Sequence, residues 1–263
     1  ARPYLLQVSH HAVHIPLSTT PELLKKYEAK RPMPGYPSNP AYAGLLEELD
    51  QSVGRIVEAV DRAGLAENTL ILFLSDNGGI EHEQSGRVVT SNRPLRGEKG
   101  TLYEGGIRIP AIARWPGRVP AGRESSTPLI TMDVYPTLLE LGGARPAPRQ
   151  PQDGVSLAKL LANPEAKLDR NTLYWHLPHY HHSTPAGAIR RGDWKLIEFF
   201  ETNAVELYDL GRDPGEKNNA AAREPQRARE LQTALAAWRR EVGARMPEPN
   251  PDHDPARASE LAG

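Results

Sequence analysis

The chain has 263 residues and a formal net charge of −1 at pH 7, from 32 Lys and Arg against 33 Asp and Glu, so it lacks the basic field that holds nucleic acid. It contains no cysteine, which excludes disulfides, thiolate zinc sites and cysteine nucleophiles. No stretch reaches the roughly 20 apolar residues that a bilayer-spanning helix needs, so we expect no membrane span.

The first predicted elements indicate an α/β fold. The apolar run Tyr4–Val8 predicts a buried strand almost at the first residue, with no secretory signal peptide before it, so we expect an internal start to a domain. Apolar residues at helical spacing then predict a helix that Ser38 or Asn39 caps and Gly64 ends. The unbroken apolar run Leu70–Leu74 is typical of a strand buried on both faces of a largely parallel sheet that helices sandwich.

Polar residues follow that strand directly. The segment TLILFLSDNGG (69–79) ends on Asp76, Asn77 and two glycines. One interpretation is a tight turn, which Asp, Asn and Gly all favour. The other is a hard-cation site, because carboxylate and amide oxygens at the carboxyl end of a sheet strand suit calcium or magnesium. This segment alone leaves both interpretations open.

The rest of the chain predicts further elements and a change of architecture. Residues 80–106 lack periodicity and predict a long ordered loop, and long loops in compact domains are often functional. A short strand within 107–115 and a helix over 134–141 follow it. Residues 187–210 predict an antiparallel meander of three strands, and a helix that begins near Pro225 follows. We expect the α/β portion at 1–162, a small α+β subdomain at 163–246 and a disordered tail at 247–263.

Several sequence blocks together carry a family resemblance. They are VSHHAVHIPL (8–17), LFLSDNGG (72–79), RPLRGEKGTLYEGGIRIPAIARWPGRVPAG (93–122), MDVYPTLLELGG (132–143), DGVSLAKLL (153–161) and AIRRGDWKLIEFF (188–200). In this order they resemble the formylglycine-dependent, arylsulfatase-like sulfatases of the alkaline phosphatase superfamily, over nearly the whole chain to about residue 246. The resemblance implies a calcium-dependent hydrolase of aryl or carbohydrate sulfate monoesters, of a family that is commonly periplasmic or extracellular.

The resemblance also implies roles for individual residues. Asp76 and Asn77 correspond to calcium ligands, and Lys99 and His14 correspond to catalytic residues that contact the sulfate ester. A divalent cation, an ammonium and an imidazole would stabilise the negative charge on the sulfate oxygens in the transition state. His179 is a further candidate for substrate contact, because loops often carry function.

His179 lies in the segment HLPHYHH (176–182), which we interpret as a loop before the small sheet. The segment contains His176, His179, His181 and His182. A tract of imidazoles is also compatible with metal binding, and the roles of the other three histidines stay open.

The nucleophile motif of the family does not occur in this sequence. Sulfatases carry an upstream C/S-x-P-x-R motif whose Cys or Ser becomes formylglycine. The serines with Pro two positions later, Ser38, Ser126 and Ser183, all lack Arg at the fifth position. The acidic pair that completes the calcium site in the family also has no counterpart. The chain therefore resembles the C-terminal half of a sulfatase, and we expect negligible sulfatase activity from this chain alone.

Two alternatives accompany this interpretation. The first is a phosphodiesterase or phosphonate monoester hydrolase of the same superfamily. The second is a non-catalytic fragment that binds a sulfated glycan.

Overall fold

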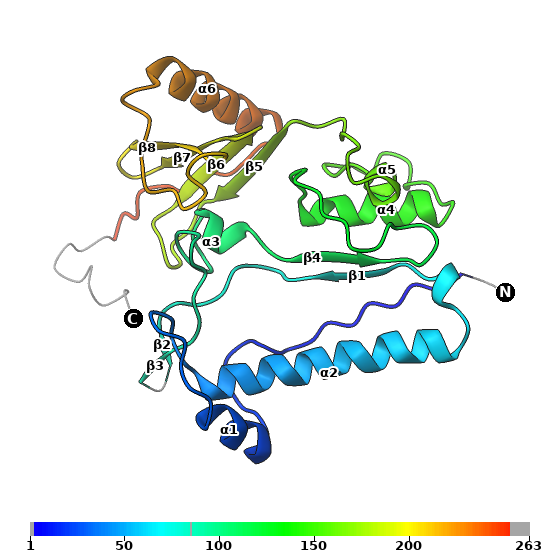
Figure 1. The fold of residues 1–263 in the computed structure, drawn as a ribbon. Helices are drawn as coiled ribbons and strands as arrows, with labels where there is room; N and C mark the ends of the chain where they lie inside the picture. Colours follow the sequence, from blue (N-terminus) through cyan, green and yellow to red (C-terminus); the bar gives the residue numbers. More distant parts are fainter. Residues whose placement is uncertain (1–2, 85, 253–263) are drawn as a thin grey trace. The chain divides into compact units, whose positions relative to one another are not determined.

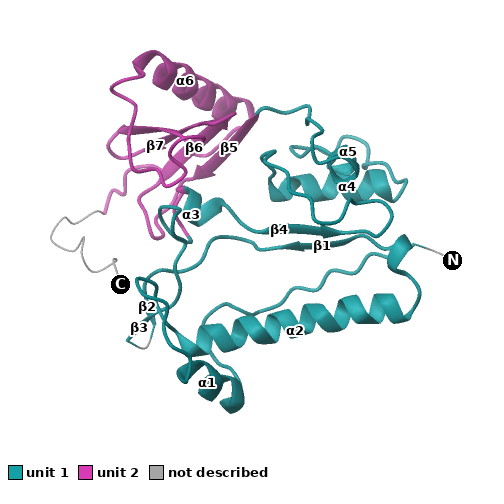
Figure 2. Cartoon of the chain, in the orientation of Figure 1, with its two compact units in different colours: residues 1–99, 104–171 teal, residues 100–103, 172–263 magenta. Residues whose placement is uncertain are grey.

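The computed structural model describes residues 3–84 and 86–252. The chain divides into two compact units, one of residues 1–99 and 104–171 and the other of residues 100–103 and 172–263 (Figure 2). Within the described ranges, no helix is long and apolar enough to cross a membrane. Of the predicted tail, residues 247–252 form no helix or strand, and residues 253–263 lie outside the described part of the chain.

The described residues of the first unit form five α-helices, two 3-10 helices (Ala66–Asn68 and Thr131–Asp133) and four short strands (Figure 1). The α-helices and strands are α1 (Pro21–Glu28), α2 (Pro40–Arg62), β1 (Ile71–Leu74), β2 (Glu83–Gln84), β3 (Arg87–Val88), α3 (Glu104–Ile107), β4 (Ala111–Arg114), α4 (Val134–Leu141) and α5 (Ala158–Ala162). Two of the predicted helices are confirmed, α2 and α4. In α2 the side-chain oxygen of Asn39 accepts the N–H of Tyr42 at 3.2 Å, and Gly64 has φ +68° just after the helix ends.

Helix α1 was not predicted from the sequence. It begins with the cap residue Thr20, whose hydroxyl accepts the N–H of Leu23 at 3.3 Å, followed by Pro21 in the first turn. It packs against α2. The Thr-Pro pair is a helix-start signal that the proline-rich surroundings obscured.

The predicted parallel sheet is not present among the residues described here. Strand β1 pairs with β4 alone and in antiparallel direction, with Ile71 opposite Arg114. The predicted strand Tyr4–Val8 is wrong, since the segment forms no strand and Leu5 is 75% exposed. An apolar run indicates that a strand is buried. Whether the neighbouring strand in the sheet runs parallel or antiparallel to it depends on residues far along the chain. The first unit therefore contains both helices and strands, as predicted, but its strands pair in antiparallel direction.

The second unit is an antiparallel sheet with one helix. Its elements are β5 (Thr172–Leu177), β6 (Ala186–Arg191), β7 (Trp194–Phe199), β8 (Val205–Asp209) and α6 (Pro225–Glu241), with strand order β5-β6-β7-β8. The three predicted meander strands and the helix are confirmed, and β5 is an additional edge strand. The core lies between the sheet and α6, where Ile189 and Leu196 meet Leu231 and Leu235.

A buried carboxylate ties together three segments of the first unit. Asp133 is fully buried and accepts both terminal nitrogens of Arg170, at 2.5 and 2.7 Å. It also accepts the backbone N–H groups of Ile130 and Val155, each at 3.0 Å. These four bonds satisfy a charge that would be costly to bury alone.

We predict that Asp133→Asn lowers the free energy of unfolding by about 1.5–3 kcal/mol, because an amide removes the charge and turns one acceptor into a donor facing other donors. Urea denaturation followed by circular dichroism measures the change. Glu58→Gln is the matched control, because its ion pair with Arg62 is exposed and should contribute less than about 1 kcal/mol. Equal effects of the two substitutions would contradict the assigned role of Asp133.

Candidate active site

Strand β1 ends at a polar turn, residues 75–79. The Oδ1 of Asp76 accepts the N–H of Asn77 at 3.0 Å, and the hydroxyl of Ser75 donates to the Asn77 carbonyl at 3.1 Å. The side-chain amide of Asn77 donates to the carbonyl of Gly78 at 2.9 Å. Within the described residues, Oδ2 of Asp76 and the side-chain oxygen of Asn77 accept no hydrogen bond. The segment is therefore a turn that also presents two oxygens of the kind that calcium binds.

The glycines of this region are required by close backbone packing. A Cβ on Gly78 would lie 1.7 Å from the carbonyl oxygen of Gly105, and a Cβ on Gly105 would lie 2.1 Å from that of Gly97. The N–H of Gly78 donates to the Gly106 carbonyl at 2.9 Å. The turn after β1, the loop that carries Lys99 and the start of α3 are therefore in direct backbone contact.

Asn92 joins the turn to the loop. Its side-chain oxygen accepts the N–H of Gly79 at 2.9 Å, and its amide donates to the carbonyls of Gly79 at 2.9 Å and Gly97 at 3.1 Å. The N–H of Lys99 donates to the Gly79 carbonyl at 3.1 Å. Asn77 is two residues before Gly79, so the proposed metal ligands and Lys99 belong to one hydrogen-bonded loop assembly. Sequence reasoning missed Asn92, because no motif around it marks a loop-bridging amide.

Lys99 and His14 meet although they are 85 residues apart. The Nζ of Lys99 lies 3.0 Å from Nε2 of His14, and Nδ1 of His14 lies 2.8 Å from the carbonyl oxygen of Ile15. A carbonyl can only accept, so Nδ1 carries a proton and Nε2 accepts from the Lys99 ammonium. His14 is exposed and Lys99 is half-buried, so an anion from solvent can reach both groups.

The histidine-rich segment belongs to the second unit and is only partly a loop. His176 lies in β5, and its Nε2 is 2.7 Å from the carbonyl oxygen of Arg245, so the prediction of a loop is wrong at this residue. The alternation in TLYWHL, with its β-branched and aromatic residues, is the signal that would have indicated a strand. His179 is exposed in the segment between β5 and β6, and its contact with substrate stays a prediction. The rings of His181 and His182 contact each other edge to face, with centroids 4.5 Å apart.

Family models cover most of the chain. The model described as Sulfatase matches residues 1–144, and the model described as N-sulphoglucosamine sulphohydrolase, C-terminal, matches residues 97–241. The two matches overlap over the loop that carries Lys99.

Individual relatives agree with these models. A sulfatase from Formosa agariphila is 36% identical over 260 residues, which cover 90% of this chain and 46% of that protein. The steryl-sulfatase of Mus musculus is 32% identical over 283 residues, which cover 96% of this chain and 43% of that protein. The crystal structure of Ps i-CgsB matches with a TM-score of 0.74 and 29% identity, over 86% of this chain and 48% of that one.

The chain spans about half the length of the curated relatives it matches. A family model over more than half of its residues, together with relatives above 30% identity along nearly all of it, shows that this chain belongs to the sulfatase family.

Proposed function

We propose that this chain supplies the sulfate-binding and calcium-binding groups of a sulfuric ester hydrolase. The observation that carries the proposal is the convergence of Lys99 and His14, with 3.0 Å between Nζ and Nε2. A sulfate monoester presents an anionic group that needs donors. The ammonium of Lys99 is one donor, and a doubly protonated His14 would supply a second one from Nε2.

Lys99 and His14 would contact different oxygens of the sulfate ester. The ammonium of Lys99 hydrogen-bonds a non-bridging sulfate oxygen and stabilises the charge that develops there. When His14 is doubly protonated, its Nδ1–H stays on the Ile15 carbonyl and its Nε2–H donates to the leaving ester oxygen. The carbonyl of Ile15 thereby orients the imidazole for proton transfer.

Asp76 and Asn77 are the proposed calcium ligands, through Oδ2 and the side-chain oxygen. Calcium takes about six to eight oxygens, so these residues would form part of its shell. When bound, the cation would neutralise charge on the sulfate group. The role of this chain is to hold the two oxygens on a turn that Gly79 and Asn92 tie to the Lys99 loop.

A carbohydrate sulfate is the proposed substrate class of the whole protein. A structure of Ps i-CgsB contains k-i-k-neocarrahexaose, which supports a sulfated carbohydrate as the ligand here. We also propose that His179 contacts the part of the substrate that is not the sulfate group. Because the C/S-x-P-x-R motif does not occur in this sequence, binding of a sulfated glycan without hydrolysis is the second candidate function of the chain.

The proposal predicts calcium-dependent binding of a simple sulfate ester. Isothermal titration of the 263-residue chain with calcium should show a site that Asp76→Ala weakens by about 10-fold or more, the loss of one charge-assisted contact. Asp50→Ala is the matched control, since Asp50 is exposed on α2. A parallel titration with 4-nitrophenyl sulfate should give tighter binding when calcium is present.

Calcium affinity that is equal in Asp76→Ala and Asp50→Ala would contradict the proposed ligand. Release of 4-nitrophenol, followed in the same samples, separates hydrolysis from binding. Calcium-dependent turnover by this chain would contradict the expectation of negligible activity.

A further inference from the structure

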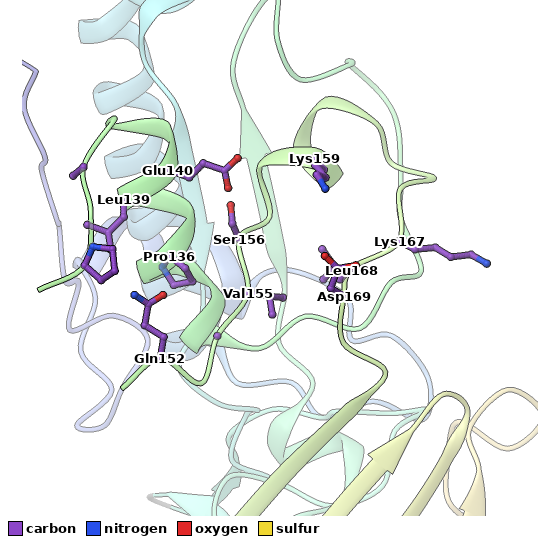
Figure 3. Close-up of a pocket in the computed structure, with 13 residues that line it drawn as sticks. Pro136, Leu139, Glu140, Gln152, Val155, Ser156, Lys159, Lys167, Leu168 and Asp169 are labelled. Carbon is purple, nitrogen blue, oxygen red and sulfur yellow. The ribbon is translucent and has the colours of Figure 1, made fainter. Parts of the chain in front are cut away.

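Two cavities of the first unit differ in their charge. One, of about 530 Å³, lies beside α4 and α5 (Figure 3), and its charged residues have both signs. They are Glu140, Asp169, Lys159 and Lys167. The other, of about 260 Å³, is lined by residues of α1, the segment between α1 and α2, the start of α2, and residues 89–91. Among residues 3–84 and 86–252, no acidic residue lines this second cavity, whereas Lys30 and Arg31 do.

A third cation is held beside this smaller cavity. The guanidinium of Arg93 lies over the ring of Tyr36, 5.2 Å from its centroid, and Nε donates to the hydroxyl of Ser91 at 3.2 Å. Both Tyr36 and Ser91 line the cavity. Among the residues described, no carboxylate pairs with Arg93, Arg31 or Lys30. The planar guanidinium is thus positioned by a ring and a hydroxyl, and its two terminal nitrogens are available to an anion.

The cavity also has aromatic walls. Tyr27, Tyr36 and Tyr42 line it, and Tyr36 is 48% exposed. The hydroxyl of Tyr27 donates to Glu47 at 2.8 Å. The hydrogen bond from Lys26, followed by that from Tyr27, lowers the pKa of Glu47, which shows that both donors favour the ionised carboxylate. Aromatic walls with a few fixed polar groups are typical of sites for small ligands or single units of a polymer.

One wall of the cavity is hydrogen-bonded to the loops of the candidate active site. The N–H of Thr90 donates to the Ile80 carbonyl at 3.2 Å, so the lining segment runs beside the turn that follows β1. Ser91 is adjacent to Asn92, which bonds to Gly79, and Gly79 accepts the N–H of Lys99. The segment that lines the cavity and the loop that carries Lys99 therefore belong to one hydrogen-bonded assembly within the first unit.

We propose that this cavity is a subsite for a second anionic sugar unit of a sulfated oligosaccharide whose scissile sulfate ester lies at Lys99 and His14. The inference rests on the function proposed above and narrows its substrate class. The fixed Arg93, with Lys30 and Arg31, recognises a further sulfate or carboxylate, and the tyrosines contact the sugar ring. A steroid or aryl monosulfate carries no second anionic group, so no anion of that ligand would contact Arg93 when its sulfate lies at Lys99.

The test compares a long and a short probe on the same protein. Calcium-loaded chain is titrated calorimetrically with a sulfated carrageenan hexasaccharide, which carries several sulfate groups, and with 4-nitrophenyl sulfate, whose single sulfate group cannot occupy both sites at once. We expect Arg93→Ala to raise the ratio of the two Kd values, hexasaccharide to 4-nitrophenyl sulfate, by about 10-fold or more. Arg93→Lys keeps the charge without the planar fork and should give an intermediate ratio.

Arg55→Ala is the matched control, since it removes one exposed arginine from α2 of the same unit. The subsite is wrong if Arg93→Ala changes the ratio no more than Arg55→Ala, or if the unmodified chain binds the hexasaccharide no more tightly than 4-nitrophenyl sulfate. Failure of the proposed function has a different signature, which is binding of 4-nitrophenyl sulfate that does not depend on Lys99.

Discussion

Lys99→Ala is expected to raise the Kd of the calcium-loaded chain for 4-nitrophenyl sulfate by roughly 10- to 150-fold, the equivalent of about 1.5–3 kcal/mol for a hydrogen bond from a charged donor. The physical reason is that truncation removes the ammonium that lies 3.0 Å from Nε2 of His14. Isothermal titration measures the change. Lys25→Ala removes an exposed lysine from α1 and is the control.

A double-mutant cycle tests whether Lys99 and His14 act on the same sulfate group. Lys99 and His14 contact each other and would contact the same sulfate group, so their substitutions should not be additive. We expect a coupling energy of about 0.5–3 kcal/mol between Lys99→Ala and His14→Ala in the binding of 4-nitrophenyl sulfate. Additive effects within error would show that the two side chains do not act on one anion.

The second large effect is expected in the core of the second unit. Lys195 of β7 and Glu216 both have side chains that are 0% exposed, and Nζ lies 2.9 Å from Oε1. Lys195→Met should lower the free energy of unfolding by about 3–5 kcal/mol, because it removes the ammonium that lies beside a buried carboxylate. Tryptophan fluorescence during urea denaturation reports the change, since Trp194 and Trp238 pack against the core of this unit.

The buried pair can be distinguished from simple loss of packing by a double substitution. Lys195→Met combined with Glu216→Met removes both charges and should recover most of the lost stability. Arg212→Met is the control, because Arg212 is exposed and its ion pair with the half-buried Asp209 should contribute less than about 1 kcal/mol. A double variant that is as unstable as Lys195→Met alone would rule out the unpaired charge as the cause.

Local sequence patterns predicted the helices and strands that depend on interactions between residues close together in the chain. Helix α2 was predicted because its apolar residues repeat at helical spacing after a capping Asn39, and these signals lie within one segment. The meander β6–β7–β8 was predicted because tight turns separate its apolar runs. The glycines of the blocks 72–79 and 93–122 were part of the family resemblance, and the structure adds the reason that no Cβ fits at Gly78 or Gly105.

The sequence by itself thus determined the family, the helices α2, α4 and α6, the meander β6–β7–β8 and the residues proposed for the site. The antiparallel pairing of β1 with β4, the contact between His14 and Lys99, the bridging role of Asn92 and the cavity beside Arg93 were decided by the tertiary structure alone. The physical reason is the distance along the chain over which each interaction acts. Periodicity and turn chemistry act over a few residues, whereas a strand partner, an ammonium beside an imidazole and a basic cavity each depend on segments distant in the chain that folding brings together.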